Sequence, residues 1–181
     1  MSDLPADNNV AEVARDYELS DGTNLLEASK QTPLTLVFLR HFGCTFTRQI
    51  LRGLENLKQE ATQRGSRLVL VHMLRDGKEA KYLGDEPAVA SVSDPKCELY
   101  RAFGLGNGGL LELFGPRNWW LGIRALFQGC GVGRLAGNGL QMPGAFVLHQ
   151  GEILAAQRAR TAGDLPDLPR LFEDVSLPAS S

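Results

Sequence analysis

Long apolar runs are missing from this sequence of 181 residues. The longest one, Leu34 to Leu39, has the length of a strand, whereas a membrane-spanning helix needs roughly 20 apolar residues. The opening residues, MSDLPADNNVAEVARD, are polar and acidic and resemble neither a signal peptide nor an anchor. These absences argue against a membrane segment and predict a cytoplasmic protein whose N-terminus, residues 1–15, is flexible.

Neither sign of charge dominates, since the formal net charge is -2 and the sequence pI is near 5.9. No basic stripe is present, so the electrostatic footprint of a nucleic-acid binder is absent and nucleic acid is not an expected partner. The composition, 43% hydrophobic and 22% charged, is that of an ordinary globular domain. We expect one domain over residues 16–176, followed by a short tail, 177–181.

Cysteine is scarce, with only Cys44, Cys97 and Cys130. An odd number of cysteines in a chain without a secretion signal argues against a disulfide framework and leaves at least one free thiol. His72 and His149 lie in or beside apolar strand-like runs, and no second ligand stands at a metal-binding spacing from either. We therefore predict no metal and no cofactor, and structural roles for both histidines.

A strand, a helix and a strand follow one another in the first half of the chain. Leu34 to Arg40 (LTLVFLR) and Arg67 to Met73 (RLVLVHM) are apolar without alternation, which is typical of strands buried on both faces of a parallel sheet. Between them, apolar residues recur at helical spacing from Phe46 until Gly65 ends the run. This pattern predicts an α/β fold in which two adjacent parallel strands are joined by a helix that begins just after Cys44.

The alternation continues further along the chain. Asp94 and Pro95 have the residue types of a helix cap and the first helical residue, and Gln150-Gly151-Glu152 suits a tight hairpin turn. The remaining predicted elements are a short helix at Gly77–Leu83, strands at Ala88–Ser93, Ala145–His149 and Ile153–Arg158, a helix in KCELYRAFGL, and a closing helix at Asp167–Val175.

Residues 106–140 depart from this pattern, because glycine-rich ends flank an aromatic segment. Trp119, Trp120 and Ile123 share one helical face there. We interpret the segment as a helical insertion whose aromatic face forms a lid or a homodimer surface.

Cys44 stands between the first buried strand and the helix that follows. A thiol at a helix N-terminus faces the positive end of the helix dipole and unpaired amide groups, which favour the thiolate. Arg40, His41 and Arg48 add cationic neighbours that lower the thiol pKa further. A buried, inert cysteine is the alternative, and the strand-to-helix junction favours the reactive one.

At this junction the sequence LVFLRHFGCTFTRQ resembles the active-site segment of peroxiredoxin-like proteins of the AhpC/TSA group, in particular the bacterial branch related to selenoprotein L. The segments YELSDGTNLLEA, SVSDPKCELYRAFGL and GNGLQMPGAFVLHQGEILAAQRARTAGDLPDL resemble other parts of the same family. The resemblance implies a thioredoxin-like α/β fold: a mixed central sheet with flanking helices, an N-terminal β-hairpin, and a helical insertion before a cis-proline strand.

The resemblance also implies a substrate-binding site and shows where this chain departs from the family. Substrate would lie against His41, Phe42 and Gly43, opposite Met142 and a cis Pro143. The family's usual proline and threonine upstream of the cysteine are replaced by Val37 and His41. Many typical peroxiredoxins carry an arginine about where this chain has Pro143, so Arg40 or Arg158 would have to replace it.

Thr47 stands where a CxxC site has its second cysteine, so no local disulfide can form. Its hydroxyl lies one helical turn from Cys44 and either orients the thiolate or is a tolerated polar residue. Cys130, in GCGVG, is the better candidate for a resolving thiol. For Cys97, at another helix start, a structural filler role is favoured over a resolving one.

Together these features predict a thiol-dependent oxidoreductase, a one-cysteine antioxidant enzyme of peroxiredoxin-like type. Cys44 would attack a peroxide or a disulfide, and an external thiol, glutathione or a thioredoxin-like protein, would resolve the product. Arg40 and Arg48 would stabilise the thiolate. The rival hypothesis is a redox-silent thioredoxin-fold binding module in which the aromatic insertion carries the interaction.

Overall fold

The computed structural model describes residues 10–40, 42, 45–75, 83, 89–105, 141–159, 166–173 and 175. The helices and strands follow the chain in the order α1 (Val10–Ala14), α2 (Leu25–Gln31), β1 (Leu34–Phe38), α3 (Thr45–Arg52), α4 (Leu54–Gln63), β2 (Arg67–His72), β3 (Ala90–Ser93), α6 (Glu98–Ala102), β4 (Gly144–His149), β5 (Glu152–Arg158) and α9 (Leu168–Leu171). Of the predicted helix at 77–83 only Leu83 is described, and the predicted insertion, 106–140, lies outside the described residues.

The five strands form one mixed sheet in the order β3-β2-β1-β4-β5. β1 and β2 are adjacent and parallel, with Leu36 opposite Val69, and β2 and β3 are parallel as well. β4 runs antiparallel to both β1 and β5. The predicted mixed sheet and the parallel β1–β2 pair, joined by helices that begin at Thr45, are confirmed.

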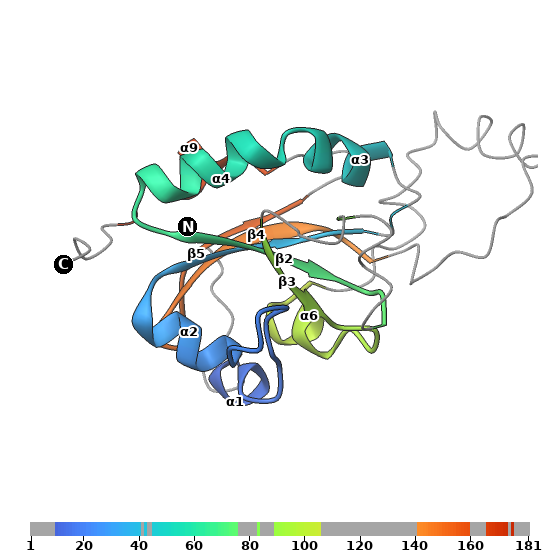
Figure 1. Ribbon diagram of the computed structural model, residues 1–181, viewed down its shortest axis with the longest axis vertical. Helices are drawn as coiled ribbons and strands as arrows, with labels where there is room; N and C mark the ends of the chain where they lie inside the picture. The colour runs from blue at the N-terminus through green and yellow to red at the C-terminus, as the bar shows by residue number, and fades with distance from the viewer. Residues whose placement is uncertain are drawn as a thin grey trace, which may run out of the picture.

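Helices cover both faces of the sheet: α3, α4 and α9 lie over one face, and α1, α2 and α6 over the other (Figure 1). Every residue of β1 is buried, because its side chains point alternately into the cores on the two faces of the sheet. Leu36 and Phe38 point into the core beneath α1, α2 and α6, whereas Val37 points into the core beneath α3, α4 and α9. Burial on both faces explains the run of apolar residues without alternation.

The predicted helix from Phe46 to Gly65 is two helices that meet at Gly53. Glycine is a weak helix former because it has no side chain to restrict its backbone, so a helix breaks most easily there. The break is slight, since the Gly53 amide still donates to the carbonyls of Gln49 and Ile50 at 3.1 Å each. Gly65, with φ 70°, ends the second helix as expected.

The N-terminal β-hairpin implied by the family resemblance is shorter than expected. It consists of one antiparallel bridge, Glu18 to Asn24, closed by a bond from the Leu25 amide to the Tyr17 carbonyl (2.9 Å). From Leu25 onward the chain is helical, because the Asn24 side chain caps α2 by accepting from the amides of Leu26 and Glu27.

The hairpin predicted at Gln150-Gly151-Glu152 joins β4 to β5, but its turn is one residue shorter, because Glu152 already belongs to β5. Both turn residues have positive φ, 53° and 82°, which is the requirement of a type I′ turn. The turn is fixed to α2, where the Ser29 carbonyl accepts from the Gln150 amide and contacts His149 Nδ1, both at 2.9 Å. His149 therefore serves a structural contact, as predicted.

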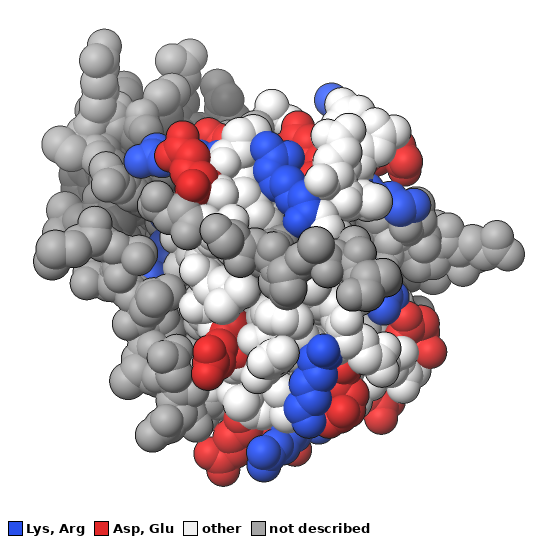
Figure 2. Space-filling model, turned by 90° about the vertical axis from the view of Figure 1, so that its left-hand side faces the viewer, with Lys and Arg blue, Asp and Glu red and all other residues white. Residues whose placement is uncertain are grey.

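No helix within the described ranges is long and apolar enough to cross a membrane. Nor does the described part of the chain hold a cluster of three or more His, Cys, Asp or Glu side chains that is suited to a metal ion. On the face shown in Figure 2, basic and acidic side chains are interspersed, so the described residues form no continuous basic patch there.

Candidate active site

The carboxyl end of β1 brings distant parts of the sequence together. β1 and β4 are antiparallel, with Phe38 opposite Gly144, so the residues that follow β1 lie beside those that precede β4. Gly144 is in turn opposite Arg158 of β5. Arg40, Pro143 and Arg158, all named from the sequence, are thus gathered at one end of the sheet.

Arg40 is a buried cation at this end, with a relative exposure of 8%. Its Nε donates to the carbonyl of Gln141 at 3.2 Å. Gln141 is 2% exposed, and its Nε2 donates to the Leu105 carbonyl at 2.8 Å. A guanidinium remains charged in proteins, so this chain of bonds holds a fixed positive charge next to the segment that contains Cys44.

Arg158 is the second arginine at this end of the sheet. Its guanidinium lies 5.4 Å from the centre of the Phe146 ring, and its Nη2 donates to the Phe103 carbonyl at 3.2 Å. Both contacts direct the cation toward the aromatic cluster beneath the sheet. Arg40 is buried, whereas Arg158 is half-buried.

Thr47 and Arg48 follow each other in the first turn of α3 but have different surroundings. Thr47 is 1% exposed, which makes it a buried polar residue at the start of the helix. Arg48 is exposed to solvent. Water screens an exposed guanidinium strongly, so Arg48 contributes less to the electrostatics of this end than Arg40 does.

Phe42 lines the same end of the sheet. It is 6% exposed, and its ring contacts the His72 ring with a centroid distance of 5.9 Å. His72 is itself 1% exposed, at the end of β2. The expectation that His72 has a structural role agrees with this buried position.

Tyr100 is a residue that the sequence analysis missed. It lies on α6, is fully buried, and its hydroxyl donates to the carbonyls of Leu39 (2.5 Å) and Val71 (3.0 Å). Burial raises the pKa of Tyr100 well above its ordinary value, so the phenol keeps its proton. Tyr100 thus connects the end of β2 to the end of β1, directly before Arg40. In the sequence, only the position of Tyr100 on an apolar helix face indicated that its side chain is buried.

Cys97 lies on the other side of the sheet from α3. It precedes α6 with a left-handed backbone, φ 55°, and is buried in the core beneath α1, α2 and α6. Burial is the main cause that raises the pKa of the Cys97 thiol; Asp94 raises it further and Arg101 lowers it. These surroundings favour the structural role over the resolving one.

Met142 and Pro143 are both buried directly before β4. No cis peptide bond occurs among the residues that the structure describes, so the cis state implied for Pro143 is wrong and the Met142–Pro143 bond is trans. Trans is the preferred state of X-Pro bonds by about 0.5–1 kcal/mol, and β4 pairs with β1 from Gly144 onward without a cis turn. His41, Gly43, Cys44 and Cys130 lie outside the described residues.

Comparison with known families identifies the chain. A model of the family described as AhpC/TSA antioxidant enzyme matches residues 53–161. The chain belongs to this family. The match begins after β1 and Cys44, so it rests on α4, the strands β2 to β5 and the segment before β4 rather than on the cysteine segment. At the level of the family, membership supports a thiol-dependent peroxidase or oxidoreductase.

Solved structures share the fold at low sequence identity. A cysteine-to-serine variant of peroxiredoxin 6 of Arenicola marina superposes with a TM-score of 0.60 at 10% identity, covering 86% of this chain and 66% of that one. A cysteine-to-serine variant of Xanthomonas campestris peroxiredoxin Q gives a TM-score of 0.51 at 20% identity, covering 87% and 88%. No curated protein matches the sequence. The predicted peroxiredoxin-like, thioredoxin-type fold is confirmed.

Proposed function

We propose that this protein is a thiol-dependent oxidoreductase that uses Cys44 as its single reactive thiol. The observation that carries the proposal is the buried Arg40 guanidinium, held by Gln141 at the carboxyl end of β1, four residues before Cys44. Cys44 directly precedes Thr45, the first residue of α3, so the helix dipole adds to the same effect. Both favour the thiolate, which is the reactive form of cysteine.

The reaction with a peroxide begins when the Cys44 thiolate attacks one peroxide oxygen. An S–O bond forms, the O–O bond breaks, and the leaving oxygen takes a proton to become water or an alcohol. The cysteine is oxidised to a sulfenic acid. An external thiol then condenses with the sulfenic acid to a mixed disulfide and water, and a second thiol releases reduced Cys44 as the thiols are oxidised to their disulfide.

A disulfide substrate would be attacked in the same way. The Cys44 thiolate forms a new S–S bond while the leaving sulfur departs as a thiolate, and an external thiol resolves the mixed disulfide. Thr47 stands where a CxxC site has its second sulfur, so turnover depends on that external thiol. We assign Thr47 to orient the thiolate and Phe42, Met142 and Pro143 to line the substrate site.

The test is the pH dependence of alkylation of each cysteine, followed by mass spectrometry. Cys44 should react fastest and should titrate below the ordinary cysteine pKa of about 8.5, whereas Cys97 serves as the internal reference. Mild peroxide should oxidise Cys44, added thiol should restore it, and Cys44→Ser should abolish peroxide consumption. Oxidation confined to Cys97 or Cys130 would reject the enzyme and leave the binding module.

The role of Thr47 is tested separately. Thr47→Val keeps the shape of the side chain and removes its hydroxyl, so a raised Cys44 pKa is expected if that hydroxyl donates to the thiolate. Arg48→Gln, on the exposed face of the same turn, is the matched control and should leave the pKa nearly unchanged. An unchanged pKa in Thr47→Val would assign Thr47 to packing alone.

A further inference from the structure

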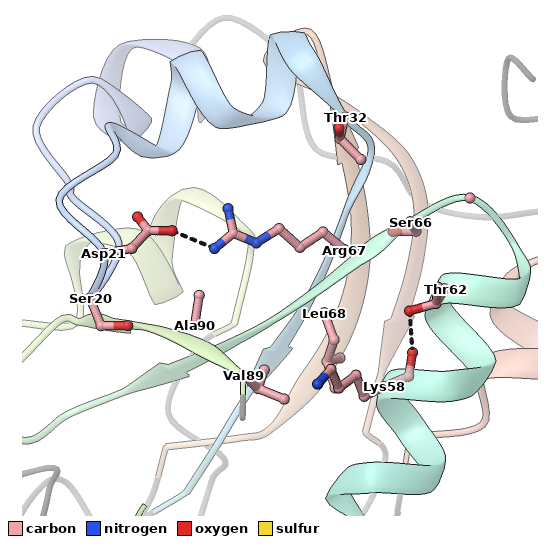
Figure 3. A pocket seen from close by; sticks show the side chains of 11 residues that line it. Ser20, Asp21, Thr32, Lys58, Thr62, Ser66, Arg67, Leu68, Val89 and Ala90 are labelled. Carbon is pink, nitrogen blue, oxygen red and sulfur yellow. Dashed lines mark hydrogen bonds and ion pairs between the residues drawn. The ribbon is translucent and has the colours of Figure 1, made fainter. Parts of the chain in front are cut away.

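A hollow of about 640 Å³ opens at the amino ends of β2 and β3, whereas Arg40 follows the carboxyl end of β1. This volume lies within the range of roughly 300–1,000 Å³ that small-molecule sites occupy. Its walls come from the turn before α2, from α4 and from the start of β2 (Figure 3). The hollow is therefore separate from the end of the sheet where Arg40 lies, and its lining includes none of the residues assigned to the thiol chemistry.

The two cations that line the hollow have different partners. Arg67 donates to the Asp21 carboxylate at 2.5 Å, and this bond is the main cause that lowers the pKa of Asp21 to about 2. The Arg67–Asp21 pair is thus ionised and neutral as a unit. Lys58 forms no ion pair with any residue in the described ranges, so among the described lining residues one positive charge has no acidic partner.

An apolar floor accompanies this charge. Leu68 and Val89 line the hollow and are 3% and 4% exposed. The Lys58 side chain extends from α4 toward these two residues (Figure 3). A ligand with an anionic end for Lys58 and an apolar body for the floor fits both features.

Hydroxyl groups complete the lining. The Ser20 hydroxyl oxygen accepts from the Ser91 amide at 3.1 Å, which leaves its proton available to a ligand. The hydroxyl of Thr32, at the end of α2, lies on the opposite wall (Figure 3). These donors suit an oxygen-bearing anion, and because the Arg67–Asp21 pair is neutral as a unit, a single negative charge suffices to match Lys58.

We propose that this hollow binds a small organic carboxylate, with the carboxylate at Lys58 and the apolar part over Leu68 and Val89. A carboxylate carries the single negative charge that the lining lacks and accepts hydrogen bonds from an ammonium and from hydroxyls. The site is a binding function in addition to the thiol chemistry and does not depend on it.

Titration of the full-length protein with hexanoate, followed by amide chemical shifts in NMR, tests the proposal. The expected shifts are confined to the residues around the hollow, such as Lys58, Arg67 and Ala90. Lys58→Met keeps the apolar stem and removes the charge, and should weaken hexanoate binding about fivefold, the effect of one partly exposed ion pair. Lys30→Met, which removes a lysine that pairs with Glu27 outside the hollow, should bind as the wild type does.

Hexanol tests whether the ligand needs a negative charge, and inorganic phosphate tests whether that charge must be a carboxylate with an apolar body. Hexanol has the same apolar body without the charge, and it should bind about fivefold more weakly than hexanoate. Equal affinity for hexanol, or unchanged affinity in Lys58→Met, would overturn the anion site. Tighter binding of phosphate than of hexanoate would overturn the carboxylate class, and the absence of shifts up to the solubility limit of hexanoate would overturn the site.

Discussion

Arg40 and Cys97 are both buried, but their surroundings affect their charged forms differently. Arg40 keeps its charge while its Nε bonds to a carbonyl at the end of β1. The Cys97 thiol gains no stabilisation of its charged form, because burial and Asp94 both raise its pKa. Residue type made both positions candidates for the proposed redox site, and burial with Asp94 disfavours the thiolate at Cys97.

The surroundings of Cys97 predict that its thiol reacts slowly. Its alkylation should be slow at neutral pH and should accelerate only above the ordinary cysteine pKa of about 8.5, because the thiol reacts as its thiolate. The measurement is the pH profile of iodoacetamide labelling at Cys97. Arg101→Gln should move the profile further upward, since that guanidinium lowers the Cys97 pKa; a Cys97 that titrates below the ordinary value would contradict the prediction.

The Asp21–Arg67 ion pair predicts a pH-dependent contribution to stability, and its side chains are 42% and 41% exposed. The pKa of Asp21 falls from 3.8 to about 2, so the pair stabilises the fold above pH 3.8 and loses this effect as the pH falls toward 2. Because solvent screens the pair, it contributes less than about 1 kcal/mol. Urea unfolding should show that the difference between wild type and Arg67→Met shrinks between pH 6 and pH 2, and a pH-independent difference would refute this.

At the scale of the element, α6 depends on contacts that its own short sequence does not provide. The helix spans five residues, and an isolated helix of that length is unstable in water. The Asp94 carboxylate holds its start by accepting from the amides of Glu98 (3.0 Å) and Tyr100 (3.1 Å) and from the Tyr17 hydroxyl (2.9 Å). Asp94 therefore links the N-terminal segment to the helix that positions Tyr100.

Replacement of Asp94 should accordingly cost more than replacement of an ordinary cap. Asp94→Ala leaves three donors without their acceptor in a fully buried position and should lower the free energy of unfolding by about 3 kcal/mol. Asp167→Ala is the matched control, because the exposed Asp167 accepts one bond, from the Arg170 amide, and should cost about 1 kcal/mol or less. If urea denaturation showed the same loss of unfolding free energy for both variants, Asp94 would contribute no more than an exposed helix cap does.

At the scale of the whole molecule, the β4–β5 hairpin and the N-terminal helices hold each other in place. Gly151 in the turn donates to the Ser29 hydroxyl of α2 at 3.2 Å. A Cβ at Gly151 would come within 2.9 Å of Leu26 Cδ1 and 3.0 Å of Ala11 Cβ. Segments more than 120 positions apart in the chain, Ser29 and Gly151 among them, thus meet at one tightly packed junction.

Two glycine substitutions separate this packing from backbone strain. Gly65→Ala has only the strain of a positive φ, since nothing lies within 4 Å of the added carbon, and should cost about 1 kcal/mol. Gly151→Ala has the same strain and the contacts with α1 and α2, so its loss should exceed that of Gly65→Ala by about 1–3 kcal/mol. Comparable unfolding midpoints for the two variants would mean that α1 and α2 shift to accommodate the added carbon without a loss of unfolding free energy.

The sequence by itself was enough for the sheet and the class of fold. The apolar run of β1 without alternation is typical of burial on both faces, and Gln150-Gly151-Glu152 between two strand-like runs is typical of a tight hairpin turn, so both were predictable from local pattern. The family resemblance of the segment around Cys44 led to the same thioredoxin-like fold. Local rules predicted a cap at Asp94 with Pro95 as the first helical residue, which is wrong, because α6 begins at Glu98 and its N-cap is Cys97. The Asp94 carboxylate nevertheless accepts from the amides of Glu98 and Tyr100.

Only the tertiary structure showed which polar side chains are buried at the carboxyl end of β1. The sequence ranked Arg48 with Arg40, but one is exposed and the other is buried against Gln141, which lies 101 positions away. It gave no sign that Tyr100 would join the carbonyls of Leu39 and Val71, and it implied a cis Pro143 where the bond is trans. Hydrogen bonds and burial between segments distant in sequence depend on how the sheet brings its strands together, and residue spacing along one chain does not contain that information.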